Sequence, residues 1–149
     1  MSSKPAFLPL LRELVRSYQA FERFSGSHVQ AMGLTMAQFD VIATLGNTEG
    51  MKPKQLGERT LITKGTLTGV IDRLERKGLV QRLADPDDGR CQIVRLTASG
   101  QQLFESVFPR HLAHLERAFG QLRPQQLQQA ESALQALRQA LESTTENRR

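Results

Sequence analysis

Basic side chains gather in the middle third of the chain, where they could attract a polyanion. Residues 52–96 hold ten Lys or Arg and six Asp or Glu, whereas residues 1–51 hold four of each kind. Residues 97–149 hold six basic and five acidic residues. A local surplus of positive charge concentrates anionic partners at that surface. A basic surface that is only solvated has the same counts, so the local residue pattern must distinguish the two.

One predicted helix, at residues 63–77, carries side chains suited to reading nucleic-acid bases. Its apolar positions recur at helical spacing and must face a core: Leu67, Val70, Ile71 and Leu74. A helix turns by about 100° per residue, which determines the residues that point away from that core. The opposite face and its flanks hold Lys64, Gly65, Thr66, Thr68, Gly69, Asp72, Arg73 and Arg76.

Small residues on this outer face favour close contact with DNA. Thr66 and Thr68 can exchange hydrogen bonds with bases, and their methyl groups can touch thymine methyls. A glycine in a helix interior costs about 1 kcal/mol, so Gly69 either serves a close approach of the backbone or is a tolerated surface glycine. Asp72 would repel phosphate, and we expect Arg76, one turn further on, to pair with it.

A second short helix and a hairpin are predicted around this surface. A helix at residues 53–60 precedes the one at 63–77. Residues 79–83 and 91–96 are strand-like runs, and the segment between them is dense in Asp, Pro and Gly, which predicts a hairpin. Two helices joined by a tight turn and followed by a basic hairpin form a winged helix-turn-helix, whose second helix fits the major groove of B-DNA.

The hairpin, or wing, offers three arginines to DNA. Arg90 at its tip could enter a minor groove, where narrow A·T tracts attract arginine. Arg82 and Arg95 on the strands suit backbone phosphates. Three acidic residues also lie between the strands, at Asp85, Asp87 and Asp88. We expect them to pair with nearby arginines and so to aim Arg90.

Long helices flank this DNA-binding lobe of residues 34–97. Thr35 and Gln38 form a capping box that begins the first helix of the lobe. Helical periodicity predicts further helices, at residues 6–30, 98–119 and from 124 onward. The expected fold class is therefore mainly α with a small β-hairpin wing, a winged helix-turn-helix plus long terminal helices.

The terminal helices, within residues 5–32 and 98–145, carry more apolar positions than a small lobe needs. Such stripes must be buried, either in an intramolecular bundle or against a second chain. We expect a twofold homodimer, the commonest form of oligomer.

The stretch from residue 60 to residue 100 resembles the DNA-binding core of the MarR family of bacterial regulators. The shared elements are Leu67, the run from Asp72 to Glu75, the run from Gly78 to Val80, Arg82, Asp85, the run from Asp88 to Arg90, Leu96, Thr97 and Gly100. Upstream, the family pattern is matched by Leu34, Thr35, Gln38, Phe39 and Leu45. The resemblance covers nearly the whole chain, because long helices at each end are the family's dimerisation elements.

The resemblance implies a transcriptional regulator, expected to be a repressor, whose homodimer binds a palindromic site on double-stranded DNA. Two recognition helices would occupy successive major grooves, and two wings would occupy the flanking minor grooves. The residues expected to bind DNA are Thr63, Lys64, Gly65, Thr66, Thr68, Gly69, Arg73, Arg76, Arg82, Arg90 and Arg95. Many family members carry a long polar or basic side chain where this chain has Gly69, so base readout here would rest on fewer groups.

The resemblance also implies a small aromatic or anionic effector, which would bind in a crevice between the lobe and the dimerisation helices. Four residues of the first helix could line such a crevice: Arg12, Arg16, Tyr18 and Arg23. The alternative for these side chains is plain surface or pairing between helices. A ligand can shift DNA binding only if it prefers one spacing of the two recognition helices.

No set of residues suggests catalysis, a bound metal or a cofactor, so an enzyme is not expected. A nucleophile would need an oriented base, and no glycine-rich phosphate loop occurs. His111 and His114 stand three residues apart, but a metal needs three or four ligands and His28 is distant in sequence, so we expect solvated or interface histidines. Cys91 is expected to be an inert, half-buried strand residue beside Arg90.

A soluble, cytoplasmic protein is expected. No stretch approaches the roughly 20 apolar residues that cross a bilayer, and the first helix carries Glu13 and Glu22 where a signal peptide would be continuously apolar. The alternative function is a winged-helix module that binds an acidic protein partner. Such a surface should expose apolar or aromatic residues. The glycines and threonines of the predicted recognition face provide neither.

Overall fold

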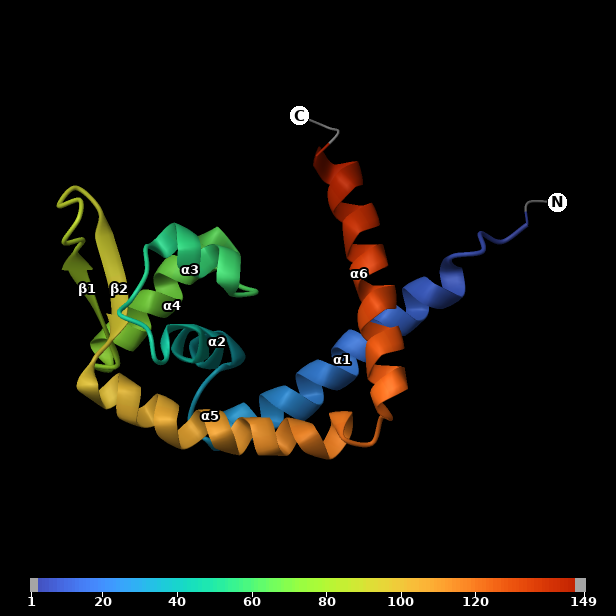
Figure 1. The fold of residues 1–149 in the computed structure, drawn as a ribbon, viewed down its shortest axis with the longest axis horizontal. Helices are drawn as coiled ribbons and strands as arrows, with labels where there is room; N and C mark the ends of the chain where they lie inside the picture. The colour runs from blue at the N-terminus through green and yellow to red at the C-terminus, as the bar shows by residue number, and fades with distance from the viewer. Residues whose placement is uncertain (1–2, 147–149) are drawn as a thin grey trace. The chain divides into compact units, whose positions relative to one another are not determined.

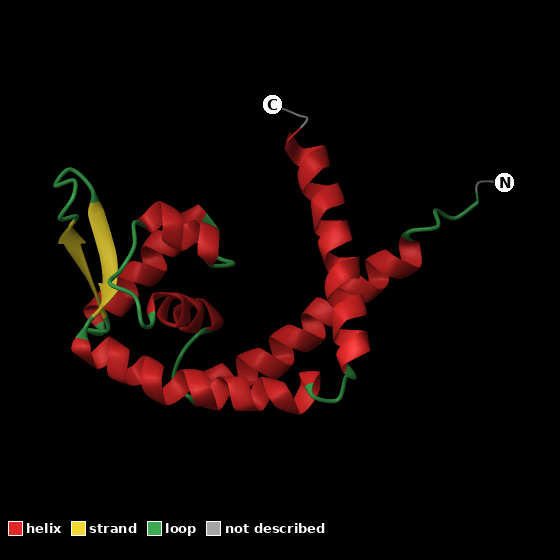
Figure 2. Cartoon of the chain, in the orientation of Figure 1, coloured by secondary structure: helices red, strands yellow, loops and turns green. Residues whose placement is uncertain are grey.

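The computed structural model describes residues 3–146 and contains six helices and two strands (Figures 1 and 2). In chain order they are α1 (Leu8–Ala31), α2 (Met36–Leu45), α3 (Pro53–Arg59), α4 (Lys64–Arg76), β1 (Val80–Ala84), β2 (Gln92–Leu96), α5 (Ala98–Phe119) and α6 (Pro124–Glu146). The predicted fold class, mainly α with a small β-hairpin, is confirmed. The chain divides into two compact units after His111, within α5, and each is described by itself.

The N-terminal unit is built around α2, which packs against α1, α3, α4 and β2. The predicted capping box begins this helix, since Thr35 Oγ1 accepts from the Gln38 N–H and Gln38 Oε1 accepts from the Thr35 N–H, both at 3.1 Å. The core of the unit consists of apolar side chains from every element: Val29, Leu34, Val41, Ile42, Leu45, Met51, Leu56, Leu67, Val70, Ile71, Leu74, Val80, Val94, Phe104 and Val107.

The hairpin is antiparallel, and Met51, from the loop before α3, forms a further β-bridge with β2. Val80 pairs with Leu96 and Ala84 with Gln92, so each strand begins one residue later than predicted. On the other edge of β2, Met51 exchanges two backbone hydrogen bonds with Val94, at 2.8 and 3.0 Å. The loop before α3 is therefore fastened to the wing.

Two junctions connect the wing to its neighbouring helices. Gly78 has a φ of 73° and ends α4, as its position after the helix predicted. Thr97 Oγ1 accepts from the Gly100 N–H at 3.1 Å and so caps α5, as predicted, while it donates to the Gly78 carbonyl at 2.6 Å. The start of α5 is thus tied to the end of α4.

Two glycine variants should change stability in opposite directions. A Cβ at Gly100 would collide with the backbone carbonyl of Leu79, which cannot move aside, so Gly100→Ala should lower the free energy of unfolding by about 1–3 kcal/mol. A Cβ at Gly69 meets nothing within 4 Å. Gly69→Ala should therefore raise the free energy of unfolding by up to about 1 kcal/mol. Urea unfolding measures both, and equal effects of the two variants would contradict the packing described here.

A buried polar cluster joins α1 to α5. His111 is 3% exposed, its Nε2 lies 3.0 Å from Ser25 Oγ, and its Nδ1 lies 3.0 Å from Nδ1 of His28. The ring of Phe39 packs edge-on against His111. Of the two environments expected for His111, solvent and an interface, solvent is excluded, because the ring is buried between α1 and α5 with Ser25 and His28 beside its two nitrogens.

The C-terminal unit, residues 112–146, contains the end of α5 and all of α6. None of the described residues of α6 is buried within the chain. Its exposed residues include three leucines at seven-residue spacing, Leu127, Leu134 and Leu141. No helix in the described part of the chain is long and apolar enough to cross a membrane.

Candidate nucleic-acid interface

Helix α4 presents two faces of opposite character. Leu67, Val70, Ile71 and Leu74 are all buried, as the periodicity predicted. The remaining described positions at the start of the helix are exposed: Thr63, Gly65, Thr66, Thr68 and Gly69. Arg73 and Arg76 are exposed further along the helix, and Lys64 is its first residue. The structure therefore brings Gly65, Thr66, Thr68, Gly69, Arg73 and Arg76 onto one solvent-facing surface.

The cap of α4 differs from the prediction. Thr63 precedes the helix in extended conformation, but its hydroxyl makes no capping hydrogen bond. It donates instead to Thr66 Oγ1, at 3.1 Å. This contact leaves the amide groups of the first helical turn without a side-chain acceptor from Thr63.

Nothing in the protein's own packing requires glycine in the outer face of α4. A Cβ built at Gly65 or at Gly69 has no neighbour within 4 Å. Contacts within the described chain therefore do not distinguish the two interpretations of Gly69, close approach of a partner and a tolerated surface glycine. A flat backbone surface of this kind permits a partner to approach closely.

Asp72 is neutralised by an arginine of the wing and not by its helical neighbour. Arg82 Nη2 lies 2.6 Å from Asp72 Oδ1, and Arg82 Nη1 lies 2.9 Å from Glu75 Oε1. The predicted pairing with Arg76 is wrong, since Arg76 Nε donates only to the Asp72 backbone carbonyl, at 3.4 Å. From β1, Arg82 reaches the carboxylates of both Asp72 and Glu75. Arg76, on the same helix as those residues, contacts neither carboxylate.

This network changes the role expected of Arg82. Its side chain is 22% exposed, and its backbone N–H also donates to Glu75 Oε2, at 3.2 Å. It is engaged with α4 and fixes β1 against that helix. One positive charge thereby faces two carboxylates, which reduces but does not cancel their repulsion of phosphate.

The tip of the wing presents Arg90 to solvent. The side chain of Arg90 is 94% exposed, and its Nε lies 3.5 Å from Asp88 Oδ1. Asp85 lies 3.7 Å from Lys52 Nζ, so its partner is a lysine and not an arginine as expected. Asp87 donates its backbone N–H to Asp85 Oδ1, at 2.9 Å.

Asp88 organises the turn at this tip. The backbone N–H of Arg90 donates to its carboxylate at 3.1 Å, and this hydrogen bond is the main reason that the pKa of Asp88 lies below its usual value. The thiol of Cys91, 3.6 Å away, adds to the effect. The lowered pKa favours the charged form of Asp88. The carboxylate therefore remains the acceptor of the Arg90 N–H above the acidic pH range.

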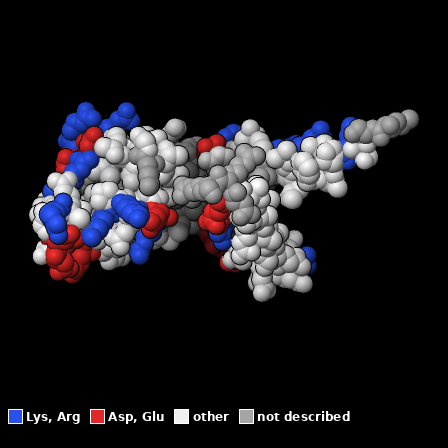
Figure 3. Space-filling model, turned by 90° about the horizontal axis from the view of Figure 1, so that it is seen from above, with Lys and Arg blue, Asp and Glu red and all other residues white. Residues whose placement is uncertain are grey.

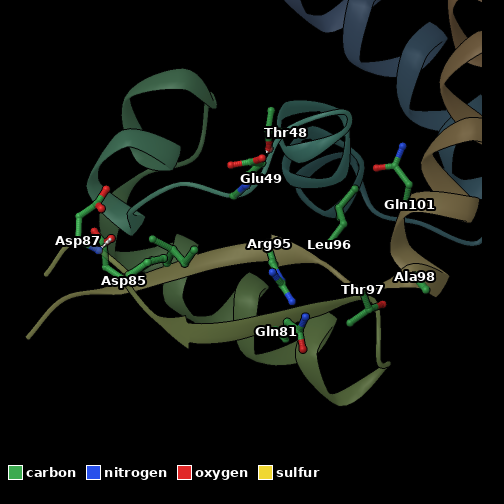
Figure 4. A pocket seen from close by; sticks show the side chains of 13 residues that line it. Thr48, Glu49, Gln81, Asp85, Asp87, Arg95, Leu96, Thr97, Ala98 and Gln101 are labelled. Carbon is green, nitrogen blue, oxygen red and sulfur yellow. Dashed lines mark hydrogen bonds between the residues drawn. The ribbon is translucent and has the colours of Figure 1, made fainter. Parts of the chain in front are cut away.

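Arg95 and Arg82 lie on opposite faces of the hairpin. Arg95 pairs with Gln81, the residue before Arg82, and successive residues of a strand point to opposite faces. The amide oxygen of Gln81, in its favourable orientation, accepts from Arg95 at 2.9 and 3.1 Å. Both residues line an open hollow of about 750 Å³ (Figure 4). Carboxylates of Glu49, Asp85 and Asp87 share this hollow, so it is not purely basic.

Charges of both signs lie close together over the lobe. In the view of Figure 3, basic side chains at the wing end border a cluster of acidic ones. The surface therefore carries both positive and negative charge. An anionic partner would be attracted most by basic side chains that project into solvent. Arg90 is such a group.

The candidate effector residues lie along α1. Arg12, Arg16, Tyr18 and Arg23 are all exposed in the described chain, with Tyr18 at 56%. None of the four lines the hollow beside the wing. Among the residues that the structure describes, no three His, Cys, Asp or Glu side chains are grouped to hold a metal ion.

One exposed residue of this region was not singled out from the sequence. Leu61, in the turn between α3 and α4, is 90% exposed. Its backbone N–H donates to Asp40 Oδ2 of α2, at 2.9 Å. The apolar residue beside polar turn positions is visible in the sequence, but its exposure follows only from the packing of the turn.

Comparison with known proteins finds regulators of the same kind. The MarR family model matches residues 34–92. The HTH-type transcriptional regulator YkoM of Bacillus subtilis (strain 168) is 32% identical over 120 residues, 80% of this chain and 78% of that protein. The multiple antibiotic resistance protein MarR of Escherichia coli (strain K12) is 32% identical over 98 residues, 66% of this chain and 68% of that protein.

Solved structures agree with these sequence matches. AbsC, a MarR family transcriptional regulator from Streptomyces coelicolor, has a TM-score of 0.84 and 25% identity, over 96% of this chain and 99% of that chain. BpsR of Bordetella bronchiseptica, whose DNA binding is regulated by 6-hydroxynicotinic acid, has a TM-score of 0.80 and 26% identity, over 91% and 97% of the two chains. These relatives are regulators and not enzymes. With its winged helix-turn-helix, the chain belongs to the MarR family of DNA-binding transcriptional regulators.

Proposed function

We propose that the protein is a repressor that binds a palindromic operator as a homodimer and is released by a small aromatic or anionic effector. The observation that carries the proposal is the outer face of α4, with exposed threonines and two glycines that no intramolecular contact requires. The first half of such a helix meets base edges in the major groove. Occupation of a promoter by such a dimer would block transcription.

The contacts with DNA are assigned to α4 and the wing. Readout in the major groove falls to Thr66 and Thr68, with Gly65 and Gly69 allowing close approach. Phosphates are contacted by Thr63, Lys64, Arg73, Arg76 and Arg95. Arg90 enters the flanking minor groove. Arg82 contributes by holding the wing against α4, through its pairs with Asp72 and Glu75.

Homodimer formation is supported by apolar side chains left in solvent in both units. At the N-cap of α1 and along that helix they are Phe7, Leu10, Leu11, Val15 and Tyr18, between 46% and 60% exposed. In the C-terminal unit they are Leu112, Phe119, Leu122, Leu127, Leu134 and Leu141. Large apolar surface on a soluble chain marks an interface, and a second copy of the chain is the commonest partner.

The proposed effector carries an aromatic ring and a negative charge. Arg12, Arg16 and Arg23 would pair with the charge and Tyr18 would contact the ring, all from exposed positions on α1. The regulation of BpsR by 6-hydroxynicotinic acid supports a compound of this class. Release of DNA requires the effector to bind more tightly to the dimer whose recognition helices no longer match the operator.

The first experiment selects binding sites from a pool of random DNA duplexes and then titrates salt against the enriched sequence. We expect a palindrome, and an affinity whose logarithm falls by about 0.9 per contacted phosphate for each tenfold rise in salt. A Thr66→Ala, Thr68→Ala double variant should lose the enriched sequence but keep the salt dependence, whereas Arg138→Ala in α6 should keep both. An acidic protein partner would replace DNA in the proposal if no sequence were enriched.

Sedimentation equilibrium of the same protein tests the homodimer, and a panel of hydroxybenzoates and hydroxypyridine carboxylates tests effector release. A monomeric protein, or a dimer that no member of the panel removes from DNA, would contradict the corresponding part of the proposal.

A further inference from the structure

We propose that Leu61 determines specificity by touching the methyl group of a thymine in each half of the bound DNA site. The inference rests on the proposed function and deepens it, because it names a readout residue outside α4. It is carried by the exposure, the anchoring and the position of Leu61 together.

The side chain of Leu61 is held almost entirely in water. It is 90% exposed, whereas the other exposed large apolar side chains of the described residues lie between 38% and 60%. Those other side chains lie on α1 and in the C-terminal unit, where a second copy can cover them. Leu61 stands apart from them, in the helix-turn-helix.

The exposure of Leu61 does not come from a loose turn. Its backbone N–H donates to Asp40 Oδ2 at 2.9 Å, which ties the turn to α2. On one side Thr60 is 6% exposed and donates its hydroxyl to the Leu56 carbonyl, at 2.8 Å. On the other side Ile62 packs against the core. The turn is fixed at three consecutive residues, and only the middle side chain faces out.

The turn directly precedes the recognition helix. Figure 1 shows α3 and α4 joined by this short segment. Leu61 lies three positions before Lys64, the first residue of α4, and Thr63 between them is also exposed. Since the N-terminal part of such a helix enters the major groove, the turn lies beside that groove when DNA is bound.

The chemistry of the neighbouring surface leaves an apolar contact to be made. Gly65 and Gly69 offer no side chain, and the threonine side chains are short. In the major groove the thymine methyl is the feature that an apolar group recognises. A leucine reaches further than a threonine, so Leu61 can contact a thymine that the helix itself does not.

The test replaces each thymine of the selected duplex, one at a time, by deoxyuridine, which removes the methyl group and keeps base pairing. Wild-type protein should lose affinity about 4-fold at one thymine in each half-site, the value expected for one buried methyl group. Leu61→Ala removes the contact from both protomers, so it should bind the unmodified duplex about 16-fold less tightly and be indifferent to deoxyuridine at that position. Leu61→Met, which keeps an apolar side chain, should retain the sensitivity.

Thermal unfolding of the Leu61 variants provides the control, and their midpoints should equal that of the wild type because the side chain is 90% exposed. The inference is overturned if Leu61→Ala keeps the wild-type pattern of deoxyuridine sensitivity, or if it weakens all sequences equally. Absence of any selected sequence for the wild-type protein would instead refute the proposed function, and the inference with it.

Discussion

Replacing Arg90 by alanine should weaken binding of the selected DNA site by about 1–3 kcal/mol for each protomer, which is roughly 5-fold to 150-fold. Arg90 lies at the tip of the wing, with a side chain 94% exposed and a backbone N–H held by Asp88. A narrow minor groove concentrates negative potential, so an arginine inserted there contributes more than one at an open phosphate. Because a homodimer carries two wings, the losses should combine.

The measurement is a titration of the labelled duplex with each variant at several salt concentrations. Arg90→Lys should recover part of the affinity, since it keeps the charge but not the planar group. Arg138→Ala is a matched control, because Arg138 is also an exposed arginine paired with a carboxylate, Glu142, but belongs to the C-terminal unit. Equal losses for Arg90→Ala and Arg138→Ala would show that only net charge matters.

Replacing Leu74 by alanine should lower the free energy of unfolding by about 2–5 kcal/mol. Leu74 is fully buried and belongs to the stripe by which α4 packs on the core. A domain has about 5–15 kcal/mol in total, so this variant should lose a large share of its stability. The recognition helix depends on this packing for its position, and DNA affinity should fall with it.

Urea unfolding, followed by circular dichroism, measures this loss. Leu61→Ala is the matched control, because it removes the same atoms from a side chain that is 90% exposed, and it should change stability by less than about 0.5 kcal/mol. If the two leucine variants unfolded at the same urea concentration, the assignment of the two faces of the helix-turn-helix would be incorrect.

Features that depend on neighbouring residues could be predicted from the sequence. The apolar stripe of α4 and the capping box of Thr35 and Gln38 follow from helical spacing, and both are present. Gly78 ends α4 for a local reason too, its positive φ. Helices and their inward faces are therefore accessible to such reasoning, because few long-range contacts are needed to specify them.

Pairings between distant residues could not be predicted in the same way. Helical spacing favoured Arg76 as the partner of Asp72, but Arg82 reaches it from a strand. His28 and His111 are far apart in sequence and meet only because α1 and α5 cross there. Side-chain contacts of this kind depend on how elements pack, which a single sequence does not reveal.

The candidate DNA surface contains residues that local patterns predict and one residue that depends on a long-range contact. The residues of α4 and the exposed Arg90 lie where helical and hairpin patterns placed them. Leu61 was missed because an apolar residue beside a helix start is normally expected to face the core. Its backbone is held by a hydrogen bond to Asp40, twenty-one positions earlier in the chain, a contact that the local sequence pattern does not show.

Arg82 of β1 holds two carboxylates of α4, those of Asp72 and Glu75. It joins β1 to α4 through two ion pairs, which favour movement of the wing together with the recognition helix. A change in the angle between wing and helix would have to break these pairs. We therefore expect the proposed effector to change the distance between the two recognition helices of the dimer, while the wing of each protomer stays on its own α4.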